Sequence, residues 1–466
     1  MKDEKLYSLF KKCTFEVFPL IDVELEKKWK KPKYENYPEL EYKKNGMPDI
    51  RSNSFTSPFK IGDLFGSWSG KPDIDLKDFQ SYQDLSTYLQ NHKEHRNSVL
   101  PDDLEPGEDA SKFDFLLTMV INEVIERYYL LNSQKTENEE LLKKIYTEVE
   151  NFMYAEDLNF DISIPILFLH FEEKLCEISD NIVVRKIEDE YHKARLIIKS
   201  YSPPISDALI SSATHELVFK NYFIKKEKKY FSSNLSNENS YPLQKFELFF
   251  NAVKIVTNYN SGFAQLLVYP HDWVDFFYID LPKLKGTSVR KYPNYFDNFY
   301  WTNGSFPSIS KVELLKIGNI YTNLLSNENN KIQIANRRFR YSYLRDNEED
   351  SILDIIIALE TLLSDNDKGE LTHKLALRIA KLISVFSQGY SALEIFELVK
   401  KIYEFRSAVV HGSHKTQSKR EIKIKNTSKP IKTIALANDY LREVIRILIE
   451  NPKYLDPKEI DKLLLQ

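Results

Sequence analysis

The segment LEIFELVKKIYEFRSAVVHG, residues 393–412, repeats apolar side chains every three or four positions and then stops at a glycine. This spacing places the apolar residues on one side of a helix, where they can pack against neighbouring helices. A glycine directly after such a repeat is a common helix terminator, because it adopts the left-handed backbone conformation without strain. The segment therefore predicts an amphipathic helix that ends near His411. Its apolar positions are Leu393, Phe396, Val399, Ile402, Phe405 and Val409.

Neighbouring segments repeat the same pattern. Together with Leu314 to Leu325 they predict an all-α bundle of about five helices over residues 306–466. A final short helix is indicated at Asp456, where a capping carboxylate precedes a proline and then Glu459. The other apolar stripes are Ile352, Ile355, Ile356, Leu359, Leu362 and Leu363; Leu375, Ile379, Leu382, Ile383 and Phe386; and Ala437, Tyr440, Leu441, Val444, Ile445 and Leu448.

Residues 111–305 mix helical and extended patterns, which predicts a mixed α/β domain with a sensing or regulatory role. Apolar spacing indicates helices at 113–128, 138–154, 188–199 and 246–258. The Ile-, Val- and Phe-rich runs 160–171 and 178–187 are typical of strands in a mixed sheet. Two stretches are interpreted as irregular. Residues 225–242 are expected to form a surface loop, and residues 282–310 a connector into the bundle.

Residues 1–110 are the least informative part of the chain. Short apolar runs, such as Cys13 to Ile21, alternate with Pro, Gly, Asn and Ser. We interpret the stretch from Tyr7 to Asp103 as short strands and loops. The expected fold class is α+β, with a mixed α/β N-terminal region followed by the C-terminal all-α bundle.

Composition narrows the classes of function. Apolar residues make up 42% of the 466, enough to bury sizeable cores. The formal net charge is −4, so any nucleic-acid binding must rest on a local basic patch. Two distant cysteines support neither a disulfide framework nor a zinc site, and no Gly-rich phosphate loop occurs, so we expect no metal and no cofactor. The N-terminus lacks a signal-peptide core and no apolar run is long enough for a membrane, which predicts a cytoplasmic protein.

The end of the 393–412 segment carries residues suited to RNA cleavage. Arg406 can grip and neutralise a phosphate, and His411 can move a proton during attack by a ribose 2′-hydroxyl. Ser407 can hydrogen-bond the phosphate or hold the arginine. An Arg and a His five positions apart also occur by chance in many helices. The surrounding sequence therefore has to decide whether this pair is catalytic or accidental.

Four motifs in order supply that context: DIIIALETLL at 354–363, Gly369-Glu370, LALRIA at 375–380 and YEFRSAVVHG at 403–412. They resemble the HEPN superfamily, and within it the Apea-like HEPN family, over roughly Ile309 to Glu450. The superfamily signature is an Arg, four to six residues and a His, with a polar residue commonly after the Arg. Arg406, Ser407 and His411 match each element.

The resemblance implies an endoribonuclease that works without a metal and leaves 2′,3′-cyclic phosphate ends. Its active groove would form where two HEPN domains pair, so a homodimer is expected. Several members of the family act in abortive infection and cut host or phage RNA, tRNA included, which implies anti-phage defence and a phage-derived trigger. Two alternatives stay open: a non-catalytic module that binds RNA or protein, and the toxin of a toxin–antitoxin system.

A basic stretch follows the motif, with only Glu421 opposing its charges as far as Lys432. Lys415, Lys419 and Arg420 are the candidate RNA-binding residues, and the alternative is a solvated lysine-rich loop. Glu360 and Arg378 lie in the other motifs, where we favour a structural ion pair between bundle helices over a place in the groove. The remaining histidines lack metal-ligand spacing, and we interpret the closest pair, His92 and His95, as surface residues.

Overall fold

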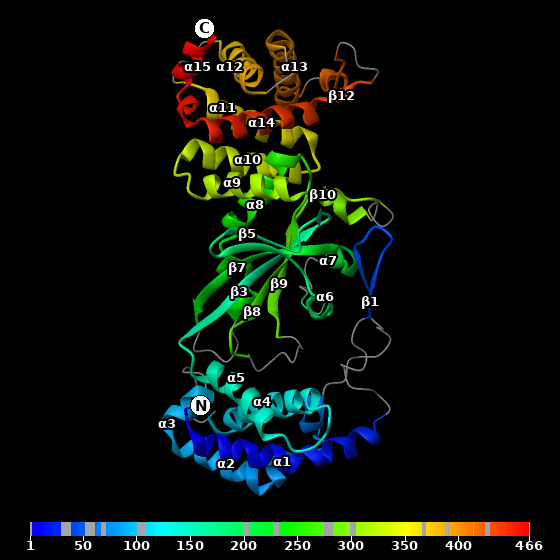
Figure 1. Cartoon of the computed structure of the whole chain (residues 1–466), viewed down its shortest axis with the longest axis vertical. Coiled ribbons are helices and arrows are strands. Elements are labelled where there is room, and N and C mark those ends of the chain that lie inside the picture. Colours follow the sequence, from blue (N-terminus) through cyan, green and yellow to red (C-terminus); the bar gives the residue numbers. More distant parts are fainter. Residues whose placement is uncertain are drawn as a thin grey trace.

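The computed structural model shows a long molecule built in three layers (Figure 1). Helices of the N-terminal part form one end, a sheet lies in the middle, and the C-terminal bundle forms the other end. One continuous set of buried apolar side chains runs through all three layers. The expected α+β class is confirmed. The structure describes residues 2–28, 39–51, 61–66, 71–99, 109–196, 198, 205–226, 233–274, 283–298, 304–365, 370–387, 389, 391–412, 414–424 and 429–465.

The N-terminal layer is helical, so the expectation of short strands and loops is wrong there. α1 packs against α2, α4 and α5, which joins residues on both sides of position 110. The 23-residue α1 is rich in aromatic and β-branched residues, which favour strands, but it buries one side through Leu6, Phe10, Cys13, Val17 and Ile21. Tertiary packing therefore overrides local propensity. The layer comprises α1 (Glu4–Glu26), η2 (Ile61–Phe65), η3 (Leu76–Asp78), α2 (Gln80–Asn91), α3 (Lys93–Val99), α4 (Asp109–Leu131) and α5 (Glu139–Tyr154).

The middle layer is a six-stranded sheet in the order β5-β6-β7-β3-β8-β9. All of its neighbouring strands are antiparallel, so the expected mixed sheet is wrong. Strand formation within 160–171 and 178–187 is confirmed, with the turn at Asp180-Asn181 between β5 and β6. The strands are β3 (Asp157–Leu167), β5 (Leu175–Ser179), β6 (Ile182–Lys186), β7 (Ala213–Lys225), β8 (Phe263–Pro270) and β9 (Lys285–Lys291).

Two of the described strands, β9 and β10, lie where the sequence predicts a connector. β9 falls within 282–310 and forms an edge of the sheet, pairing only with β8 among the described strands. Its sequence KGTSVRK is polar because an edge strand buries little. A separate parallel pair joins β10 (Ser308–Ile309) to β4 (His170–Phe171), and η6 (Asn294–Asn298) lies between β9 and β10. The expected surface loop at 225–242 includes η4 (Ser233–Ser236) and η5 (Glu238–Ser240), while residues 227–232 lie outside the described part of the chain.

A small hairpin extends from the N-terminal part of the chain to the middle layer. β1 (Glu39–Tyr42) and β2 (Pro48–Arg51) pair with each other, and they contact α6 (Asp189–Arg195) and α7 (Asp207–Ser211) beside the sheet. The Tyr42 hydroxyl donates to Asp189 at 2.6 Å, and the Asn45 amide donates to Gly304 O at 2.9 Å. The hairpin therefore rests on the middle layer, although it lies between α1 and α2 in sequence (Figure 1).

α8 (Leu243–Thr257) joins the sheet to the C-terminal bundle, as Figure 1 shows. On the sheet side, the ring of Phe246 lies 4.9 Å from that of Phe219 on β7, and the ring of Phe250 lies 5.2 Å from that of Phe263 on β8. On the other side, α8 packs against α9, α10 and α14. The mostly buried α8 thus links the bundle to the sheet, and direct contacts add to this link: α9 contacts β5, and Arg340 of α10 donates to Lys291 O at 2.7 Å.

The five apolar stripes of the last third fall on α9, α11, α12, α13 and α14. The final helix α15 begins as predicted, with Asp456 accepting a hydrogen bond from Lys458 N, although Glu459 pairs with Lys462 rather than completing the capping box. α10 was not predicted, because its sequence is rich in arginine. The bundle comprises α9 (Lys311–Leu325), α10 (Asn330–Leu344), α11 (Glu348–Leu363), α12 (Leu371–Phe386), α13 (Ala392–Val410), α14 (Thr433–Glu450), η9 (Pro452–Leu455) and α15 (Pro457–Leu464). Within the described residues, every helix is too short or too polar to cross a membrane.

The edge of the sheet offers a test of the fold. Gly286 has a φ of +142°, and a Cβ at this position would collide with Leu266 O on β8. We expect Gly286→Ala to lower the free energy of unfolding by about 3 kcal/mol, because both the backbone and the neighbouring strand would have to shift. Gly389→Ala is the matched control: its φ is +89° but the space around it is open, so a loss of about 1 kcal/mol is expected. Equal losses in urea unfolding would contradict the β8–β9 register.

Candidate active site

The three motif residues lie at the C-terminal end of α13. Val410 is the last helical residue, His411 is the C-cap, and Gly412 follows with a φ of +58°. His411 N donates to Ser407 O at 3.1 Å, and Gly412 N donates to Val409 O at 3.2 Å. The predicted end of the helix is therefore confirmed. Ser407 and His411 are exposed and Arg406 is half-buried, so the motif is open to solvent.

Burial of the opposite side of α13 sets the direction of these side chains. Ile395, Leu398, Ile402 and Phe405 are among the buried residues that face the bundle. α13 packs against α11, α12 and α14. Leu393 was expected in the same stripe, but it is 72% exposed, because it lies in the first turn before the helix meets its neighbours.

Glu360 of α11 and Tyr403 of α13 lie close to Arg406. Burial raises the pKa of the Glu360 carboxyl, and the positive charge of Arg406 offsets only part of that rise. Burial also raises the pKa of the Tyr403 phenol, with a further rise from the Glu360 charge and a partial offset from Arg406. The Tyr403 hydroxyl and Arg406 Nε are both buried and have no hydrogen-bond partner in the described part of the chain. The motif arginine thus lies beside a carboxylate and an unpaired phenol.

The structural role that the sequence favoured for Arg378, an ion pair between bundle helices, is confirmed. Its guanidinium donates to Leu363 O, Asp365 and Asp461 at 2.7 Å each, and only 3% of its side chain is exposed. These contacts tie α12 to the end of α11 and to α15. Glu360 instead belongs to the Arg406 side of the bundle, because the Arg406 charge acts on its carboxyl group.

The basic stretch after the motif is held against the bundle by ion pairs. Lys419 Nζ lies 3.0 Å from a Glu404 oxygen, and Arg420 contacts Glu348 at 2.9 Å and Glu349 at 3.1 Å. The segment includes η8 (His414–Lys419), β11 (Glu421–Ile422) and β12 (Ile431–Lys432), and Lys432 also pairs with Glu348. The candidate RNA-binding cations Lys419 and Arg420 are therefore neutralised in this state. The Lys415 side chain lies outside the described residues.

One group that the sequence did not indicate lies far from the motif. His95 was interpreted as a surface residue, but it is only 9% exposed, and it bridges Asp3 at 2.9 Å and the Tyr154 hydroxyl at 2.5 Å. Burial alone would raise the pKa of the Asp3 carboxyl, but hydrogen bonds from Leu6 N, Tyr88 and His95 lower it to about 2. No spacing rule connects residues so distant in the chain. Across the described ranges, no three His, Cys, Asp or Glu side chains gather as a metal site would require.

Glu360 offers a test of the electrostatics at the motif. A raised carboxyl pKa means that the folded protein binds this proton more tightly than the unfolded chain does. The ionised carboxylate therefore lowers stability at neutral pH, and this cost disappears as the pH falls below the ordinary value of 4.5. We expect Glu360→Gln to raise the Tm at pH 7 and to leave it nearly unchanged at pH 3.5.

The control for this measurement is Glu328→Gln, in an exposed loop between α9 and α10. It should not shift the Tm at either pH. A lower Tm for Glu360→Gln at pH 7 would show that the attraction between Glu360 and Arg406 outweighs the burial of the carboxylate, contrary to a raised pKa of this carboxyl.

Comparison with known proteins identifies no relative of this chain. No protein-family model, no curated protein and no solved structure matches the chain. The site therefore rests on the geometry of α11 and α13 and on the resemblance of the four sequence motifs.

Proposed function

We propose that this chain is an endoribonuclease that cleaves RNA without a metal, through the side chains at the end of α13. One observation carries the proposal: an arginine, a serine and a histidine of the R-x4-H pattern lie together at a solvent-open helix end. Ser407 and His411 are four positions apart and share a helix face, while Arg406 is displaced toward Glu360.

The chemistry that suits these groups is transesterification. The ribose 2′-oxygen forms a bond to phosphorus, the bond from phosphorus to the 5′-oxygen breaks, and a 2′,3′-cyclic phosphate remains. One proton must leave the 2′-hydroxyl and another must reach the departing 5′-oxygen. Arg406 would neutralise the phosphate as negative charge develops, and Ser407 would hydrogen-bond it.

This proton balance supports a homodimer. A single copy offers one motif histidine, His411, for two proton transfers. A second copy would supply another, so that one imidazole accepts a proton while the partner subunit's His411 donates one. The exposed position of the α13 end leaves room for such pairing, with Val410 presenting an apolar side chain that is 49% exposed beside His411.

Carboxylates near the motif pair with the cations that we propose as RNA ligands, so bound RNA would have to displace them. Glu360 lies beside Arg406, and Glu404, Glu348 and Glu349 neutralise Lys419 and Arg420. A bound phosphodiester would compete with each of these carboxylates for its cation. We therefore propose that the side chains around the motif rearrange when RNA binds, and that Lys419, Arg420 and Lys415 contact its phosphates.

The expected biological role follows from the family resemblance. We propose a role in bacterial anti-phage defence by abortive infection, with tRNA among the possible targets. The N-terminal and middle layers would then respond to a phage-derived trigger. A non-catalytic RNA- or protein-binding module and an antitoxin-controlled toxin are the rival functions.

The direct test is RNA cleavage in the presence of excess chelator. We expect the purified chain to cut RNA and leave cyclic phosphate ends, and His411→Ala to slow cleavage by at least ~100-fold, because it removes the proton-transfer group. His373→Ala is the matched control: this histidine is also exposed, on α12, where its ring contacts Phe396, and its loss should leave the rate unchanged.

Two outcomes would reject the nuclease assignment: cleavage that persists in folded His411→Ala protein, and cleavage that requires an added metal ion. RNA binding with no cleavage by the unmodified chain would instead favour the non-catalytic module. Circular dichroism spectra of the variants identify any loss of fold.

The dimer makes a separate prediction. Light scattering should give about twice the chain mass of 54.9 kDa. His411→Ala should be inactive, and an excess of it mixed with the unmodified chain should suppress cleavage, because a mixed pair retains only one of the two histidines that the proton transfers require. A strictly monomeric active enzyme, or full activity of mixed pairs shown to exchange subunits, would contradict a composite groove.

A further inference from the structure

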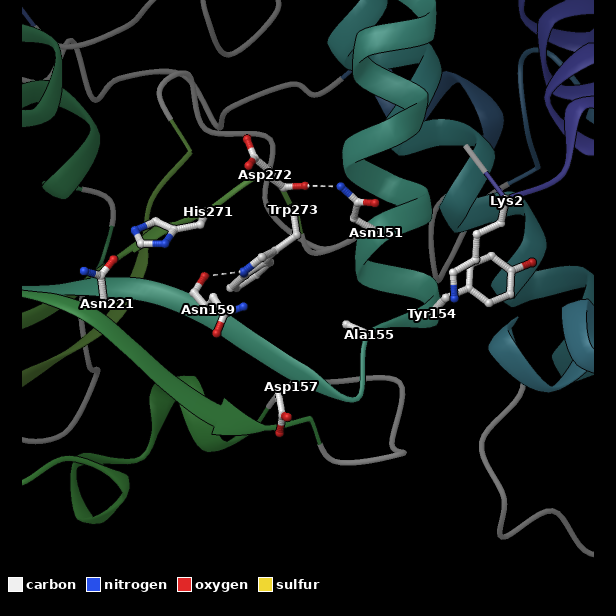
Figure 2. A pocket seen from close by; sticks show the side chains of 10 residues that line it. All are labelled: Lys2, Asn151, Tyr154, Ala155, Asp157, Asn159, Asn221, His271, Asp272 and Trp273. Atoms are coloured by element: carbon white, nitrogen blue, oxygen red, sulfur yellow. Dashed lines mark hydrogen bonds between the residues drawn. The ribbon is translucent and has the colours of Figure 1, made fainter.

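A polar pocket of about 580 Å³ lies between the N-terminal helical layer and the sheet, far from the α13 motif (Figures 1 and 2). Its walls come from the residue before the N-cap of α1, the end of α5, the first residues of β3, the second half of β7 and the turn after β8. This volume is in the range of small-molecule binding sites. The pocket is therefore large enough for a ligand of nucleoside size.

Three carboxamide side chains face the pocket from three different elements: Asn151 from α5, Asn159 from β3 and Asn221 from β7 (Figure 2). A carboxamide presents a donor and an acceptor side by side, which is the pattern that pairs with the edge of a nucleobase. Tyr154 also lines the pocket and is partly exposed, whereas Trp273, another lining residue, is only 3% exposed and packs against Phe152 in the core. An accessible aromatic ring beside carboxamides suits a flat heterocycle, because every base has a face that stacks.

The charged side chains of the pocket disfavour the binding of a phosphate group. Asp157 and Asp272 both line it, while its lysine, Lys2, lies with Nζ 4.6 Å from the centre of the Tyr154 ring. His271, the remaining titratable side chain of the lining apart from Tyr154, is paired with Asp161 at 2.9 Å. A dianionic phosphate group would meet two carboxylates, whereas ribose hydroxyls can donate hydrogen bonds to them.

The walls are held in place by contacts outside the open space. Asn151 Nδ2 donates to Asp272 O at 2.7 Å, and Trp273 Nε1 donates to Asn159 O at 2.7 Å. Behind the pocket, the Tyr154 hydroxyl is fixed by His95, which in turn contacts Asp3. Asn159 thus uses its backbone carbonyl for structure and leaves its side chain for a ligand. A wall fixed in this way loses little conformational freedom when a ligand binds.

We propose that this pocket binds a nucleoside that carries no phosphate. The carboxamides contact the base, the Tyr154 ring lies against it, and Asp157 and Asp272 accept hydrogen bonds from the ribose. The inference does not depend on the proposed nuclease activity. Because the lining comes from both layers, the bound ligand would also hold the N-terminal helices against the sheet.

The experiment uses the full chain with adenosine, guanosine, cytidine, uridine and their 5′-monophosphates, by calorimetric titration and thermal denaturation. At least one nucleoside should bind saturably and raise the Tm, and its monophosphate should bind at least about tenfold more weakly. Asn159→Ala should weaken nucleoside binding about five- to tenfold, the effect of one lost hydrogen bond. Asn323→Ala, at an exposed position on α9, is the control and should bind as the unmodified chain does.

A second variant tests the selection against phosphate. Asp157→Asn combined with Asp272→Asn removes both charges and keeps the side-chain shapes, and Asn tolerates the left-handed φ of +55° at position 272. This double variant should reduce the difference in binding affinity between the nucleoside and its monophosphate. The proposal is overturned by any one of three results: no nucleoside binds at millimolar concentration, folded Asn159→Ala protein binds equally well, or the monophosphate binds the unmodified chain as tightly as the nucleoside.

Discussion

Burial of one side of α13 is the constraint on which the rest of the candidate site depends. Side chains such as Ile402 and Phe405 are nearly inaccessible, so α13 cannot rotate about its axis without exposing them. Since each residue turns the helix by about 100°, a shift of one position would carry Ser407 and His411 away from solvent. Apolar packing therefore decides which polar groups at the end of α13 face solvent.

The two motif arginines show how a similar sequence setting leads to different physical roles. Arg378 is saturated: it has two carboxylates and a carbonyl as partners, and it holds three helices together. Arg406 has a buried Nε without a hydrogen-bond partner among the described residues. Its neighbour Glu360 has a raised carboxyl pKa, because burial disfavours the charged form. A fully paired guanidinium is a poor ligand for phosphate because its partners must first be lost, whereas an incompletely paired one can exchange its neighbour for a substrate oxygen.

The parts of the fold that could be predicted were those with a long, strict apolar period. α11 to α14 followed from their stripes, and the end of α13 followed from Gly412. Three kinds of element could not be predicted. α1 carries strand-forming residues and is helical because of its neighbours, β9 is a polar edge strand, and α10 buries Arg340 where a pattern search expects an apolar residue. At the site, the motif residues were identified from local sequence, but the proximity of Glu360 to Arg406 depends on tertiary folding. The same holds, far from the site, for the contact between Asp3 and His95.

The β1–β2 hairpin has a consequence for how the layers stay together. The chain leaves the N-terminal helices after α1, lies against α6 and α7 as the hairpin, returns to α2, and crosses once more from α5 into β3. Three covalent crossings would keep the helical layer at a high effective concentration near the sheet, even if the direct contacts between the layer and the sheet were lost. Any opening between the two layers would therefore stay local, and cleavage of a single crossing by a protease would leave the two halves associated.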